Sequence, residues 1–282
     1  MKAIILNLLA WVFLPFMDGI AKYLSADMPV LQITWARYFF TVAFTLPIMF
    51  FFFNKQLTWS EKPKLQIIRG IILLCANICF FYSISVISLA KALTLAFIAP
   101  LIVTAFSPVI LKERVGVKRW TAVIIGFIGS LVVIRPGFVE LNLASFAALG
   151  TGVMYGFYLL ITRKLSTSDN PLLTLLLTGL TGAVIISFAM PFVWVQPTAN
   201  QWYLMASIGI FAIIGHLFLI LSLKYADASK LAPFSYFEII TNILIGYYFF
   251  SNFPDNWTFL GLFIIICSGI YISRRERIVS TN

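Results

Sequence analysis

The stretch QIIRGIILLCANICFFYSISVISLAKALTLAFIAPLIVTAFSPVIL, residues 66–111, contains a single charged residue, Lys91, between Arg69 and Lys112. A helix needs about 20 predominantly apolar residues to cross the hydrocarbon core of a bilayer, so this stretch is long enough for two membrane-spanning helices joined near Lys91. Similar apolar runs fill the chain on both sides of it. We predict an all-α integral membrane protein with ten membrane-spanning helices, at residues 3–23, 31–53, 66–88, 91–111, 119–134, 143–163, 171–194, 202–223, 229–251 and 257–273.

The composition agrees with a membrane protein and excludes several other classes. With 61% hydrophobic and 11% charged residues among 282, a water-soluble fold would leave too much apolar surface uncovered. No connection between the predicted helices exceeds about a dozen residues, which leaves no room for a soluble catalytic or nucleotide-binding domain. The phosphate-binding motif GxxxxGK[ST] does not occur, so the sequence does not support ATP-driven transport, and no cofactor is expected.

The positive charges lie on alternate connections. If the N-terminus is cytoplasmic, Lys22, Lys91 and Arg135 fall on the outer side and Arg37 inside a helix, which leaves sixteen of the 20 Lys and Arg residues on the cytoplasmic side. This bias predicts a multi-pass protein of the bacterial inner membrane with both termini cytoplasmic. The net charge of +10 is spread over separate membrane-edge segments, which fits contact with anionic lipid headgroups and not with nucleic acid.

The three cysteines, Cys75, Cys79 and Cys267, all lie inside predicted membrane helices. An odd number of thiols without aqueous partners predicts no disulfide. Cys75 and Cys79 are one helical turn apart, but packing explains them more simply than metal ligation, so no metal site is expected.

The second half of the chain repeats features of the first, at offsets that shorten along the chain from 142 to 139 and then 137 residues. The matched pairs are Lys22/Lys164, Asp27/Asp169, Pro29/Pro171, Leu31/Leu173, Lys91/Lys230 and Trp120-Thr121/Trp257-Thr258. Because a unit of five helices is odd, its second copy inserts upside down. We therefore predict two inverted five-helix repeats, at residues 1–137 and 138–282.

Several motifs resemble the drug/metabolite transporter superfamily, in particular carriers with two EamA-type domains. The resemblance rests on the Arg37-Tyr38 step, the turn Leu111-Lys112-Glu113-Arg114-Val115, and the glycines Gly126, Gly129, Gly261 and Gly269. Three further stretches, residues 17–23, 215–216 and 232–236, look most similar to bacterial carriers for S-adenosylmethionine or riboflavin uptake. The resemblance implies a central cavity surrounded by the first to fourth and the sixth to ninth predicted helices, with the fifth and tenth to the side.

Ionisable residues inside the predicted helices are candidate functional residues, because a charge near the bilayer centre costs roughly 3 kcal/mol or more. Asp18 and Arg37 lie at similar depths in the outer half and are predicted to pair, either as a static ion pair or as a gate or substrate anchor; Lys22, one turn away on the helix of Asp18, is the alternative partner. His216 and Glu238 lie at similar depths in the inner half, either as a proton relay for coupled transport or as a packing contact. Counting along the helices thus places these polar groups at two depths.

Other residues are candidates for the wall of a cavity. Asn77 needs a partner from a neighbouring helix, a cavity or the substrate. Pro100 and Pro233 each remove a helical hydrogen bond, which is tolerated where the backbone faces protein or a cavity. Stacking faces and hydroxyls for a planar ligand are offered by Trp11, Trp35, Tyr82, Tyr155, Tyr158 and Tyr236. Small residues four positions apart predict close-packing seams at Ala122/Gly126/Ser130, Ala148/Gly152/Gly156 and Gly179/Ala183/Ser187.

Together these features predict a secondary transporter that moves a small organic metabolite, such as a planar nucleoside-like or flavin-like compound, by alternating access. Export of amino acids or other small metabolites is the alternative within the same class. An integral membrane enzyme is disfavoured because no HExxH, paired-carboxylate or nucleophile motif occurs, and a scaffold would not need buried charge. The candidate residues for substrate binding or gating are Asp18, Arg37, Asn77, Tyr82, Tyr155, Tyr158, His216, Tyr236 and Glu238.

Overall fold

The computed structural model describes residues 2–53, 60–112, 116–134, 142–166, 168–226, 228–231, 234–235 and 237–279. Within these residues the chain is helical and contains no β-strand. Six helical stretches are long and apolar enough to cross a membrane, which agrees with the predicted all-α membrane class. They are Lys2–Leu24, Val30–Phe51, Pro63–Val86, Leu89–Ile110, Leu143–Leu165 and Ala199–Tyr225.

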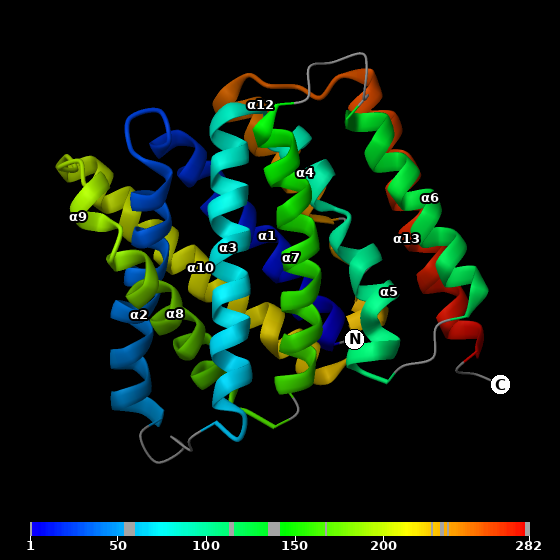
Figure 1. Ribbon diagram of the computed structural model, residues 1–282, viewed down its shortest axis with the longest axis horizontal. Helices are drawn as coiled ribbons and strands as arrows, with labels where there is room; N and C mark the ends of the chain where they lie inside the picture. Colours follow the sequence, from blue (N-terminus) through cyan, green and yellow to red (C-terminus); the bar gives the residue numbers. More distant parts are fainter. Residues whose placement is uncertain are drawn as a thin grey trace.

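The helices form a bundle with one pair set to the side (Figure 1). Within the bundle, the most extensive helix–helix contacts join α1 to α10 and α3 to α7. At one edge, α6 and α13 pack against each other. The helices are α1 (Lys2–Leu24), α2 (Val30–Phe53), α3 (Pro63–Val86), α4 (Leu89–Ala96), α5 (Ala99–Ile110), α6 (Val117–Ile134), α7 (Leu143–Leu165), α8 (Pro171–Ser187), α9 (Met190–Val193), α10 (Ala199–Tyr225), α11 (Ala228–Leu231), α12 (Phe237–Phe250) and α13 (Asn256–Val279).

Three of the predicted spans are interrupted in the structure. The span predicted at 91–111 is split into α4 and α5, because Pro100, at the start of α5, has no N–H to continue the preceding helix. The span at 229–251 is split into α11 and α12, and Phe234 and Ser235 between them are not α-helical. The span predicted at 171–194 is divided into α8 and the short helix α9. Interrupted helices expose backbone polar groups, so they are expected to face a cavity and not lipid.

The seam of small residues on α7 holds this helix against the break between α4 and α5. A Cβ added at Gly152 would lie 2.5 Å from the carbonyl oxygen of Ala96 and would also collide with Cγ2 of Ile98. One turn further, a Cβ at Gly156 would lie 2.7 Å from Cβ of Ile102. Only glycine allows the backbones to approach this closely, so the predicted seam fixes the position of the broken helix.

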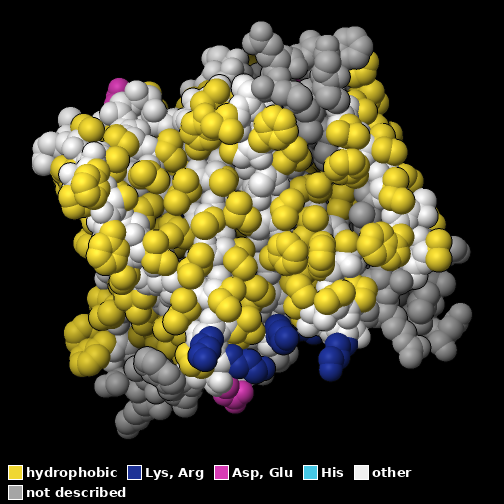
Figure 2. Space-filling model, viewed as in Figure 1, with side chains coloured by type: hydrophobic (Ala, Val, Ile, Leu, Met, Phe, Trp, Pro, Cys, Tyr) yellow, Lys and Arg dark blue, Asp and Glu magenta, His cyan; other side chains and the backbone are white. Residues whose placement is uncertain are grey.

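The surface has a charged end and a broad apolar belt. Figure 2 shows the Lys and Arg side chains of the visible face gathered at its lower edge, the end where α3 begins and α7 ends (Figure 1). Above this edge the visible surface is mostly hydrophobic. Many large apolar side chains of the described residues are exposed, among them Phe51 at 76% and Phe192 at 86%. Exposure of this kind is stable in lipid and not in water.

A buried polar network closes the charged end between α3 and α8. Asp169, in the turn before α8, accepts hydrogen bonds from Ser60 and from Gln66 Nε2, the latter at 2.6 Å. Burial alone would raise the pKa of Asp169, but the hydrogen bonds from Ser60, Gln66 and Ser168 outweigh it and hold the pKa below its ordinary value. The ionised carboxylate therefore fastens the turn before α3 to the turn before α8.

Candidate functional site

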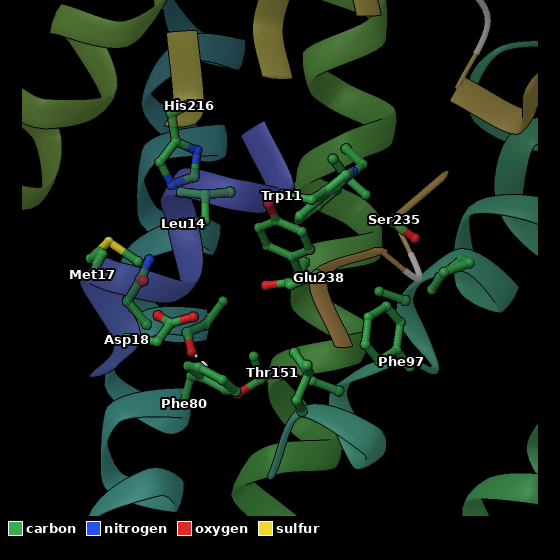
Figure 3. A pocket seen from close by; sticks show the side chains of 18 residues that line it. Trp11, Leu14, Met17, Asp18, Phe80, Phe97, Thr151, His216, Ser235 and Glu238 are labelled. Atoms are coloured by element: carbon green, nitrogen blue, oxygen red, sulfur yellow. Dashed lines mark hydrogen bonds between the residues drawn. The ribbon is translucent and has the colours of Figure 1, made fainter. Parts of the chain in front are cut away.

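A cavity of about 90 Å³ lies in the middle of the bundle, between α1, α3, α7, α10, α12 and the break of α4 and α5 (Figure 3). Its wall combines aromatic rings with a small number of polar groups, as is typical of sites for small molecules. The aromatic lining residues are Trp11, Phe80, Phe97 and Tyr155, and the polar ones are Asp18, Asn77, Thr151, His216, Ser235 and Glu238.

Two carboxyl groups dominate the polarity of this wall. Asp18 on α1 is 3% exposed, and Glu238 is half-buried in the first turn of α12. Figure 3 shows both side chains entering the same space, and they are close enough to interact electrostatically. Among the described residues that line the cavity, none is Lys or Arg. The cavity therefore presents an acidic and aromatic surface without a cation of its own.

His216 forms the wall between this cavity and a guanidinium group. Arg37 Nη2 lies 2.6 Å from His216 Nε2, and Tyr158 Oη lies 3.2 Å from His216 Nδ1. Because a guanidinium can only donate, His216 Nε2 must be the acceptor, and the remaining imidazole proton sits on Nδ1 and is donated to the Tyr158 oxygen. The contacts thus assign one neutral tautomer to His216 in this structure.

The predicted pairs are rearranged by these contacts. Arg37 forms no salt bridge with Asp18, and its Nε instead donates to Met17 Sδ at 3.3 Å. Asp18, His216 and Glu238, which helix counting places at two depths, all line one cavity. Helix counting assumes straight helices, whereas α10 runs obliquely (Figure 1) and Glu238 follows a break.

The aromatic candidates divide between the cavity wall and its support. The Tyr155 ring stacks on the Tyr158 ring with centroids 5.3 Å apart, and Trp11 meets Tyr155 edge-on at 6.5 Å. Tyr158 is completely buried behind this wall. Asn77 Nδ2 donates to Tyr38 Oη at 3.1 Å and to the Leu73 carbonyl, which orients the amide at the cavity edge.

The cavity is therefore lined by several, but not all, of the residues that the sequence predicted for its wall. Trp11, Asp18, Asn77, Tyr155, His216 and Glu238 line it, with Arg37 and Tyr158 directly behind. Tyr82 is not in the lining, Trp35 packs against Trp194 at the periphery, and Tyr236 lies outside the described residues. The prediction missed the lining residues Phe80, Phe97, Thr151 and Ser235.

Position relative to the helix breaks could have identified three of the missed residues. Phe97 lies in the α4–α5 break, Ser235 lies between α11 and α12, and Thr151 precedes Gly152 on the seam that holds the first break. Discontinuous helices commonly form the substrate sites of secondary transporters. Phe80 has no comparable signal among the many phenylalanines of the chain.

Comparison with known proteins covers almost the whole chain. The model of the EamA-like transporter family matches residues 1–135 and again residues 142–274. An S-adenosylmethionine uptake transporter of Rickettsia prowazekii (strain Madrid E) is 24% identical over 96% of this chain and 94% of its own length. A riboflavin transporter of Vibrio cholerae serotype O1 is 26% identical, with 92% and 91% covered. A pseudopaline exporter, CntI, of Pseudomonas aeruginosa is 27% identical, with 98% and 97% covered.

The fold is also shared with a solved structure. One crystal structure superposes on this chain with a TM-score of 0.74 and 16% sequence identity, and 98% of each chain is covered. At this identity the likeness shows a common fold and carries no information on the substrate.

Proposed function

Because this chain belongs to the EamA-like transporter family and is a transporter of small molecules rather than an enzyme, we propose that it carries a small organic cation through the central cavity. A planar aromatic part and a positive charge are the features that this cavity selects. S-adenosylmethionine has an adenine ring and a sulfonium centre and so combines both features. It is the compound in the name of the Rickettsia prowazekii relative.

The two carboxyl groups of the cavity wall are the observation that carries this proposal. Ionisable groups inside a membrane are costly unless they have a partner. Asp18 and Glu238 face the cavity, and no lysine or arginine stands in the described lining; Arg37 acts on Asp18 from outside it. A cationic ligand would therefore be the counter-charge of Glu238 within the cavity. The rings of Trp11 and Tyr155 add stacking surface for a planar group and cation–π attraction for the charge.

A neutral flavin is a weaker fit to the same wall. Aromatic surface alone would serve an isoalloxazine ring, and the two carboxyl groups would then be left without a function. Export remains the second candidate for direction, and the likeness to the pseudopaline exporter favours it. Both directions use the same cavity.

We further propose ten membrane-spanning segments in two inverted repeats, residues 1–137 and 138–282. The packing supports the repeat, because the contact of α1 with α10 is mirrored by that of α7 with α3, and the contact of α2 with α10 by that of α8 with α3. The two successive matches of the family model agree with this division. The charged end in Figure 2 supports placing both termini on the cytoplasmic side of the inner membrane.

This arrangement suggests how access to the cavity alternates. A second cavity of about 30 Å³ shares Trp11 and Ser235 with the first and extends to Asn7 and Leu223, toward the charged end. At the opposite end Lys22 Nζ donates to the carbonyl of Ile84 at 2.6 Å. We propose that Lys22 closes the outer side and that rocking of the two halves opens it. Both ring nitrogens of His216 are engaged by Arg37 and Tyr158, so our proposal for coupling is proton exchange through Glu238, which faces the cavity.

Binding of two related nucleosides tests the charge requirement. S-adenosylhomocysteine lacks the sulfonium methyl group and its positive charge but keeps the rest of the molecule. We expect isothermal titration with the purified protein to give at least about 30-fold weaker binding of S-adenosylhomocysteine than of S-adenosylmethionine, because the acidic wall loses its counter-charge. Equal affinities, or preferential binding of riboflavin, would contradict the proposed cation specificity.

A further inference from the structure

A thin wall separates the central cavity from the second cavity, which extends toward the charged end of the bundle. The described residues that line both cavities are Trp11, Pro100, Leu159 and Ser235. They come from α1, the first turn of α5, α7 and the break between α11 and α12. A solute that moves between the central cavity and the charged end by this route must therefore displace part of this wall.

Trp11 has the largest side chain in the wall (Figure 3). The ring of Pro100 is closed on its own backbone and cannot turn away. Leu159 and Ser235 are smaller, so a change of rotamer at either would open less space. The indole ring of Trp11 is a flat plate that meets Tyr155 only edge-on, with centroids 6.5 Å apart. Rotation of this ring would thus open the wall furthest.

A series of hydrogen bonds holds the indole ring in place. Trp11 Nε1 donates to Asn7 Oδ1 at 2.8 Å, and Asn7 Nδ2 donates to Ser222 Oγ at 3.3 Å. The Ser222 hydroxyl in turn donates to the Leu219 carbonyl at 2.7 Å. Because an indole N–H can only donate, Asn7 must present its oxygen to Trp11 and its NH₂ group to Ser222. The series therefore runs in one direction, from the ring on α1 to the backbone of α10.

The position of Asn7 separates its role from that of a substrate-binding residue. Asn7, Trp11 and Ser222 are almost completely buried, and a buried hydrogen bond is expensive to leave unmade. The indole ring therefore turns only when Asn7 releases its N–H group. Asn7 lines the second cavity and is absent from the lining of the central one. It can thus act on the central cavity through Trp11.

We propose that Asn7 is a positioning residue that acts through Trp11 and holds the indole ring across the passage from the central cavity to the charged end. When the bond between them breaks, the ring turns and the passage opens. This inference rests on the proposed transport by alternating access. It adds an inner gate to the outer closure by Lys22.

Access of a thiol reagent to the central cavity tests the proposal on the whole protein in lipid nanodiscs, without substrate. The native cysteines are first replaced by alanine, at Cys75, Cys79 and Cys267. Thr151→Cys then places one thiol in the lining of the central cavity and outside that of the second. The probe is trimethylammonium-ethyl methanethiosulfonate, which reacts with the thiolate and so reports where water and solute reach. Mass spectrometry of the intact protein gives the rate.

Asn7→Leu is expected to accelerate modification of this thiol about 10-fold, because loss of one hydrogen bond shifts the balance between the closed and open gate by roughly this factor. Leucine is close to asparagine in size but cannot accept the indole N–H. Trp11→Phe removes the donor of the same bond and shortens the ring, so it should accelerate the reaction at least as much. Adding Asn7→Leu to Trp11→Phe should then have no further effect, since the bond is already absent.

Two controls separate a gate from general loosening of the bundle. Val103 lines the second cavity and not the central one, so a thiol introduced by Val103→Cys lies outside the gate. Asn7→Leu should leave its modification rate unchanged. Asn200→Leu makes the same chemical change at an exposed position at the other end of α10 and should alter neither rate.

Three results would overturn the proposal. The first is an unchanged rate at Thr151→Cys in the Asn7→Leu variant, and the second is an equal acceleration at Val103→Cys. The third is a further acceleration when Asn7→Leu is added to Trp11→Phe, which would show that Asn7 acts by another route. Because no substrate is present, these failures would leave the proposed cation transport untouched. Failure of S-adenosylmethionine to bind would, in turn, leave the expected modification rates unchanged.

Discussion

Glu238→Gln is expected to weaken binding of S-adenosylmethionine about 100-fold, because removing one partner of a desolvated charge pair costs about 2–5 kcal/mol. The substitution keeps the size of the side chain and its capacity for hydrogen bonds, but it removes the counter-charge that Glu238 offers to the cavity. Isothermal titration of the purified variant measures the change. The Tm should stay near that of the wild type, since no described cation is bonded to this carboxyl group.

Glu61→Gln is the matched control, because Glu61 is exposed in the turn before α3 and far from the cavity lining. Its affinity should equal that of the wild type. If Glu238→Gln binds substrate normally but loses uptake driven by a pH gradient, Glu238 serves proton coupling and not substrate charge. If Glu238→Gln binds and transports substrate normally, Glu238 is only a packing contact.

Gly152→Ala is expected to destabilise the protein by about 2 kcal/mol, corresponding to a fall in Tm of about 5 °C. The added methyl group would meet the backbone oxygen of Ala96 at 2.5 Å, and a backbone atom cannot move aside as a flexible side chain can. Relief of this clash requires the break between α4 and α5 to shift. Since Ala96 and Phe97 line the central cavity, substrate affinity should fall as well.

Gly150→Ala provides the control two residues away on the same helix. A Cβ at Gly150 meets only Met154 Cε at 3.7 Å, which is an ordinary contact. Replacing a helical glycine by alanine here should leave the stability unchanged or raise it by about 0.5–1 kcal/mol. Equal Tm values for the two variants would show that the seam does not hold the broken helix.

The sequence was most informative where one physical effect dominates. Apolar runs predict helices because the bilayer forces the backbone to satisfy its own hydrogen bonds, so the predicted spans overlap the helices of the structure, including the interrupted ones. The high cost of intramembrane charge likewise singled out Asp18, His216 and Glu238, which the structure brings into one cavity wall.

Side-chain partners depend on packing between distant segments, and the sequence did not reveal them. Arg37 was expected to pair with Asp18, but the oblique course of α10 brings His216 to it instead. Glu238 was placed in the inner half of the span predicted at 229–251, whereas it lies in the first turn of α12, after an interruption. Aromatic residues in the predicted helices could not be assigned to the cavity from the sequence either. Trp35 and Tyr155 were equally good candidates for its lining, and only Tyr155 lines it.

Uptake of radiolabelled S-adenosylmethionine into proteoliposomes tests whether the acidic aromatic cavity carries an organic cation across the membrane. We expect saturable uptake above that of empty liposomes, inhibited by unlabelled S-adenosylmethionine, unaffected by riboflavin, and reduced about 100-fold at subsaturating substrate in Glu238→Gln. Uptake no greater than in empty liposomes, or uptake that riboflavin competes away and the Glu238→Gln substitution leaves intact, would contradict it.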